Sequence, residues 1–173
     1  MTMQFVRRAC AVALACVCSF SVSVAWAGTY ILKTSRPGNQ TFEESTDPHL
    51  LDLGESHGTS LSVQTAGPAT RLLILVNAEC TVAGTTTEDW LRVEILVDGI
   101  VLTPSGGLGH AVCTADGDGL LNNWVMAASD ASTVVGAGTH TVELRGSLAF
   151  GAGVPGADWW IGDLSLIVIA NNE

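Results

Sequence analysis

Basic residues are scarce in this sequence of 173 residues: seven are lysine or arginine, against 17 aspartates and glutamates. The formal net charge of −10 repels a phosphate backbone and an anionic lipid surface, and the few basic residues are scattered. This balance argues against nucleic-acid binding. It is typical of a protein kept soluble outside the cell, and it also favours the attraction of cations such as Ca²⁺.

Long apolar runs are lacking after residue 27. The longest one near the C-terminus, 164–170, is far too short to cross a bilayer as a helix. The N-terminus differs, because Arg7 and Arg8 precede an apolar stretch and a small-x-small site that ends at Ala27. These features predict a signal peptide over 1–27, removed on export, and a secreted mature chain, 28–173, with no transmembrane segment. That length suits a single domain.

Cysteine is also sparse once the signal peptide is gone. Cys10, Cys16 and Cys18 lie within it, so only Cys80 and Cys113 remain in the mature chain. In an oxidising exterior two remaining thiols are expected to pair. We therefore predict one structural disulfide, which closes a loop of 33 residues.

Specific motifs of catalysis are lacking too. The segment 54–58 has the Gly-x-Ser-x-Gly spacing, but no helix is predicted after it, as a nucleophile elbow requires. His49 and His57 are eight residues apart in a segment broken by Pro48 and Gly54, so they do not form a helical zinc motif. We therefore do not expect an enzyme. A small secreted hydrolase stays open as an alternative, since catalytic groups can assemble from distant residues.

What the mature chain does contain is the two-residue period of β-strands. Alternate residues from Leu91 to Val97 form one apolar face, and the residues between them are mostly polar. The next dipeptide, Asp98-Gly99, suits the positive φ angles of a tight turn, and apolar residues resume after it. This pattern predicts a hairpin over 91–103.

Further strands are predicted over 30–34, 50–53, 61–65, 71–79, 124–128, 138–145 and 158–170. Clusters of Gly, Ser, Asp and Pro between them, such as 104–107 and 151–156, indicate loops. About eight strands without a helix predict an all-β fold: an antiparallel β-sandwich of the jelly-roll type. We expect Trp90 and Trp124 to anchor its core.

Three motifs occur in an order known from one family. They are Val97-Asp98-Gly99, the strand entry Ala137-Gly138-Thr139-His140-Thr141-Val142, and a closing strand with an aspartate before alternating apolar residues. Over 71–170 the sequence resembles the galactose-binding-like jelly-roll domains, which include several carbohydrate-binding modules. The resemblance implies a jelly roll that binds sugars through exposed aromatic rings and polar loop residues, often with a structural Ca²⁺.

The closing strand contains the best candidate for such a ring. Trp159 and Trp160 are adjacent, so a strand directs them to opposite faces. Trp160 shares its phase with the apolar residues of 164–168, which predicts that it lies in the core. Trp159 would then face outward beside Asp163, and we predict these two as carbohydrate-binding residues. The alternative is that Trp159 packs under the loop at 151–156.

A second candidate site is a loop rich in hard oxygen ligands. Asp116 and Asp118 alternate with glycines, and Asn122 follows closely. This composition suits Ca²⁺, although the bidentate glutamate of an EF-hand is missing, because Ala127 takes its position. A solvated turn is the alternative interpretation.

Three functions are compatible with these features. The first is a secreted, non-catalytic module that binds carbohydrate, and it predicts an exposed aromatic ring beside polar residues. The second is a structural or surface-assembly protein, which predicts an extended apolar surface or self-association. The third is the small hydrolase, which predicts a cleft with converging carboxylates.

Overall fold

The computed structural model describes residues 29–42, 47–54, 56–85, 87–102, 111–149 and 157–172. The predicted signal peptide and the predicted loops at 104–107 and 151–156 lie outside these residues. The regular elements of the described part are all β-strands. Within that part, no helix is long or apolar enough to span a bilayer.

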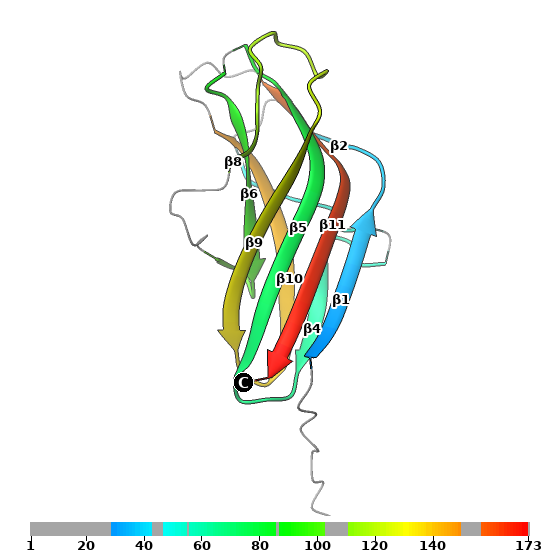
Figure 1. Cartoon of the computed structure of the whole chain (residues 1–173), viewed down its shortest axis with the longest axis vertical. Coiled ribbons are helices and arrows are strands. Elements are labelled where there is room, and N and C mark those ends of the chain that lie inside the picture. Colours follow the sequence, from blue (N-terminus) through cyan, green and yellow to red (C-terminus); the bar gives the residue numbers. More distant parts are fainter. Residues whose placement is uncertain are drawn as a thin grey trace, which may run out of the picture.

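The described strands form two antiparallel sheets that pack face to face (Figure 1). Sheet A has the order β1 (Thr29–Arg36), β11 (Asp158–Asn172), β5 (Thr70–Ala83) and β9 (Val125–Val135), and β2 (Gln40–Phe42) also pairs with β11. Sheet B has the order β3 (His49–Leu50), β10 (Gly138–Ala149), β6 (Trp90–Val97) and β7 (Ile100–Val101). In sheet B, β4 (Ser60–Thr65) also pairs with β10, and β8 (Ala111–Thr114) also pairs with β6.

Interrupted strands account for the extra elements. β2 continues β1 along β11, β3 and β4 lie along β10, and β7 and β8 lie along β6. When each of these pairs is counted as one strand, the described chain has eight strands in the orders 1-8-3-6 and 2-7-4-5. This is the connectivity of a jelly roll. The predicted all-β sandwich is therefore confirmed.

The core lies between the sheets, where the alternation of the sequence places it. Alternate residues of β5 from Leu72 to Val82 and of β6 from Leu91 to Val97 are buried there. The predicted hairpin is confirmed, since β6 and β7 pair across a turn at Asp98 and Gly99 with φ angles of 53° and 75°.

The predicted disulfide is confirmed as well. Cys80 of β5 and Cys113 of β8 are bonded, with their Cα atoms 6.1 Å apart. β5 belongs to sheet A and β8 to sheet B, so the disulfide links the two sheets.

The predicted orientation of the tryptophans in β11 is wrong. Trp159 is fully buried at 0% exposure, and Trp160 lies on the outer face of sheet A, the side away from sheet B. The cause is a β-bulge: three steps along β11, from Gly162 to Ser165, match two steps along β5. Asp163 within the bulge has a φ of +41°. One extra residue reverses the side-chain alternation, so the phase of the later residues does not apply to the tryptophans.

Two further expectations need correction. Trp124 is not a core anchor, because it precedes β9 and is 36% exposed. Trp90 is half-buried on the outer face of sheet B, since its neighbour Leu91 points into the core. The strand predicted over 124–128 is the start of the longer β9.

Candidate functional site

Two tryptophans from distant parts of the chain meet on the outer face of sheet A. Trp160 lies on β11 between Thr41 of β2 and Thr81 of β5. Trp124 approaches from the segment before β9, and the two ring centroids are 5.9 Å apart with their planes at 59°. Thr81 is fully buried although it faces away from sheet B, which we attribute to the indole rings on either side. We call Trp124 and Trp160 the tryptophan pair.

Gly162 explains how this pair can lie close to the sheet. A Cβ atom at this position would lie 3.4 Å from Cζ3 of Trp124 and 2.5 Å from Oδ1 of Asn39. A larger residue would therefore push both side chains away. The glycine thus brings the ring of Trp124 and the amide of Asn39 together over β11.

Polar side chains border the tryptophan pair. The Gly38 N–H donates to Oδ1 of Asp163 at 3.1 Å, which fixes the exposed carboxylate beside the bend between β1 and β2. Glu79 of β5 is the cross-strand partner of Gly162 and lies half-exposed on the same face. Together with Asn39, these carboxylates place hydrogen-bonding oxygens on the same face as the tryptophan pair. Met126, which is 70% exposed, extends the apolar surface on β9.

The residues predicted from the sequence therefore include one residue of this face, Asp163, and neither ring. A signal for Trp160 was present, because an isolated glycine inside a strand often marks a bulge, and Gly162 is such a residue. No comparable signal placed Trp124, since the sequence does not show which distant segment packs over Gly162.

The predicted calcium residues form a turn held by their own hydrogen bonds. Oδ1 of Asp116 accepts from the Asp118 N–H at 3.1 Å, and Oδ1 of Asp118 accepts from the Leu120 N–H at 2.8 Å. The amide of Asn122 donates to the other oxygen of Asp118 at 3.1 Å. In the part of the chain that the structure describes, no three His, Cys, Asp or Glu side chains form a metal-binding group. Calcium binding by this turn stays a prediction.

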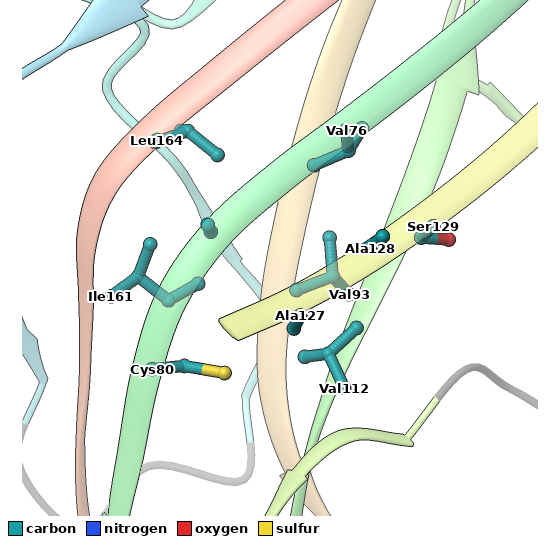
Figure 2. Close-up of a pocket in the computed structure, with 10 residues that line it drawn as sticks. Val76, Cys80, Val93, Val112, Ala127, Ala128, Ser129, Ile161 and Leu164 are labelled. Carbon is teal, nitrogen blue, oxygen red and sulfur yellow. The ribbon is translucent and has the colours of Figure 1, made fainter. Parts of the chain in front are cut away.

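Two cavities are alternative candidates for a binding site. The first has a volume of about 720 Å³ and lies beside β1. Among its described lining residues, Asp52 is the one carboxylate. Both of its oxygens accept hydrogen bonds at 3.0 Å, one from Nε of Arg36 and the other from the Gly54 N–H. These hydrogen bonds hold the pKa of Asp52 below its usual value, and the bond from Gly54 has the larger effect. The second, between the sheets near Cys80, measures about 10 Å³ (Figure 2) and has room for about one water molecule.

His140 and Asp98 form a second polar cluster, away from the tryptophan pair. Nδ1 of His140 lies 2.7 Å from Oδ2 of Asp98, and Nε2 lies 3.2 Å from the carbonyl oxygen of Gly136. Since both ring nitrogens face oxygen acceptors, the doubly protonated ring fits best. The hydrogen bond to Asp98 raises the pKa of His140, and the same bond, with that from the Thr141 N–H, lowers the pKa of Asp98.

We expect this pair to make stability depend on pH. The pKa of His140 in the folded state lies above the reference value of 6.5. The contribution of His140 to the free energy of unfolding is therefore complete below pH 6.5 and is lost as the pH rises through the folded-state pKa. The contribution of Asp98 is lost only as pH falls below 3.8. His140→Gln should therefore lower the free energy of unfolding more at pH 5.5 than at pH 8.5, by less than about 1 kcal/mol because the pair is partly exposed. Urea unfolding at both pH values, with His57→Gln as the control, checks this; an equal loss at both would contradict it.

Comparisons with known proteins give structural neighbours only. No protein-family model and no curated protein match the sequence. Among solved structures, that of infectious bursal disease virus strain Gt shows 12% identity over 83% of this chain, with a TM-score of 0.44. The C-terminal domain of EclA, described as a sugar-binding protein, shows 15% identity over 88% of both chains, with a TM-score of 0.31. The virus VP2 subviral particle shows 13% identity over 83% of this chain, with a TM-score of 0.34.

This chain spans about a third of the length of the viral chains, 33% and 37% respectively. At such identities the matches concern the fold alone, and the jelly-roll assignment rests on the strand order described above.

Proposed function

We propose that this domain is a secreted module that binds carbohydrate on the outer face of sheet A, at the tryptophan pair. The observation that carries the proposal is the pair of indole rings, 5.9 Å apart, with Trp124 36% exposed and Trp160 half-buried, on the face that also carries Asn39, Glu79 and Asp163. Indole rings offer large apolar surfaces with little conformational entropy to lose. Pyranose rings have an apolar face that stacks on such surfaces and hydroxyls that pair with amide and carboxylate oxygens.

The location of these rings supports a binding role. Trp124 is 36% exposed and Met126 is 70% exposed, so both side chains leave apolar surface in contact with water. This surface does not stabilise the fold through burial, whereas it could contact a ligand. The hydrolase alternative requires carboxylates that converge in a cleft. Among the described residues that line the 720 Å³ cleft there is one carboxylate, and it is paired with Arg36. The disulfide is compatible with an oxidising exterior.

The charge on this face suggests which sugars would bind. Glu79 and Asp163 both border the tryptophan pair, and the whole chain is strongly acidic. Uronic and sialic acids would be repelled by these carboxylates, whereas neutral sugars and amino sugars would not. We therefore propose neutral or amino sugars as the ligands.

Trp124→Ala should weaken glycan binding about tenfold or more, because one stacking ring is lost. The fold should persist, since the ring lies outside the core. A glycan array followed by calorimetry on the identified sugar measures the affinity, and thermal melting checks the fold. Trp90→Ala is the matched control, because Trp90 is half-buried on the outer face of sheet B. Binding that survives Trp124→Ala, or a wild type that binds no glycan, would contradict the proposal.

A further inference from the structure

The outer face of sheet A carries a second apolar area, at the opposite end of the strands from the tryptophan pair. Ile167 and Ile169 of β11 and their cross-strand partners Leu75 and Leu73 of β5 all point away from sheet B. Ile31 of β1 pairs with Ile169 at its edge and is 63% exposed. We call these five residues the aliphatic face. Figure 1 looks onto sheet A, and no described strand crosses in front of the lower parts of β11, β5 and β9.

Such a face is unusual for the solvent side of a sandwich. A sheet with one face in the core normally has polar residues on the other, and β5 instead is apolar on both sides here. Large contiguous apolar surface on a secreted protein indicates an interaction partner. The charges around the face indicate the kind of partner.

Two charged residues lie at the edges of the aliphatic face. One row across the sheet runs from Lys33 through Ile167 and Leu75 to Asp130. The two charges have opposite signs and stand at the same level on β1 and β9. Three strand spacings, about 14 Å, separate them, so they cannot pair within one chain.

We propose that the aliphatic face binds a second copy of this chain, sheet A against sheet A, about a two-fold axis parallel to the strands between β11 and β5. This symmetry places β1 of one copy over β9 of the other. Lys33 of each copy then faces Asp130 of the other, and Ile167 faces Leu75 across the interface. Two stacked sheets lie about 10 Å apart, and the isoleucine and leucine side chains of the two copies would fill the space between them. The result is an isologous dimer with an aliphatic centre and two charge pairs at its edges.

The size of the face sets the expected strength. The interface would comprise the aliphatic face and the polar residues around it: four strands about 4.8 Å apart, paired over the eight residues of β1, give an area roughly 20 Å by 25 Å. Stable interfaces bury about 800 Å² on each partner, so this one lies at the small end. The dimer should therefore be reversible and dissociate on dilution.

The test exchanges the two charges between copies. Sedimentation velocity over a concentration series should show a monomer–dimer equilibrium for the secreted wild-type protein. Lys33→Glu and Asp130→Lys should each weaken dimerisation about tenfold or more, because both symmetric contacts then join like charges. In a 1:1 mixture of the two variants each contact again joins opposite charges, so the dimer should return. Glu88→Lys, in an exposed turn, controls for the change in net charge.

A second variant tests the aliphatic centre. Ile167→Asp should leave a folded monomer, as judged by circular dichroism and melting, and if it does not fold the charge exchange still decides. A wild type that stays monomeric up to millimolar concentration would overturn the proposal. So would single charge variants that dimerise like the wild type, or a mixture that stays monomeric. These readouts are masses, so they are independent of glycan binding.

Discussion

Replacing Trp159 with alanine should lower the free energy of unfolding by about 3–5 kcal/mol, the usual cost of removing a large aromatic side chain from a core. Trp159 is fully buried and stacks on Phe42, with ring centroids 4.0 Å apart and planes at 16°. Its ring also fills the space over Gly146, where a Cβ atom would lie 2.6 Å from Cη2 of the indole. The packed surroundings leave little freedom to close the cavity. Urea unfolding monitored by circular dichroism measures the loss.

The neighbouring residue supplies the matched control. Trp160→Ala removes the same side chain one position along β11, but from the half-buried outer face. It should therefore lower the free energy of unfolding much less than Trp159→Ala. A larger loss for Trp160→Ala would show that the bulge between Gly162 and Ser165 is absent and that the alternation continues unbroken.

The fold could be predicted from the sequence because its signals are local. The alternation from Leu91 to Val97 and the Asp98-Gly99 dipeptide each define their own structure within a few residues, and the hairpin followed from them. The pairing of Cys80 with Cys113 followed from the number of cysteines left after the predicted signal peptide. Such features do not depend on where distant segments lie.

The proposed binding face could not be predicted because it depends on one residue. The phase of β11 was read backwards from the apolar residues after position 163, and the extra residue at the bulge makes that extrapolation fail. An error of one residue exchanges the core and the surface. The alternation therefore predicts Trp159 at the surface and Trp160 in the core, the reverse of what the structure shows.

Trp124 and β9 show a different limit. β9 is an edge strand whose residues are mostly small, and its alternation is weak, so only its first residues were recognised as a strand. The contact between Trp124 and Trp160 joins residues 36 positions apart, and the ring of Trp124 packs over Gly162, where a side chain would leave less room. Pairings of this kind come from tertiary packing, which a single sequence does not encode in its periodicity.

Removing the disulfide should lower the free energy of unfolding by about 3–4 kcal/mol, because the bond closes a loop of 33 residues and restricts the unfolded chain. Cys80→Ala combined with Cys113→Ala tests this without leaving a free thiol. The two sulfurs are also buried, at 0% and 3% exposure, and Cys80 lines the small cavity of Figure 2, so their removal enlarges an existing void. Loss of packing therefore adds to the entropic effect.

Reduction of the wild-type protein separates these two contributions. A reduced wild type retains the buried sulfurs but loses the link between β5 and β8, so its stability should fall between those of the oxidised protein and the double variant. Urea unfolding of all three proteins gives the order, and the mass of the alkylated, unreduced protein shows whether the bond has formed. Two alkylated thiols in the unreduced protein, or a double variant as stable as the oxidised wild type, would contradict a stabilising disulfide. The expected order, with the double variant lowest, would show that the link between the sheets and the packing around it both stabilise the sandwich.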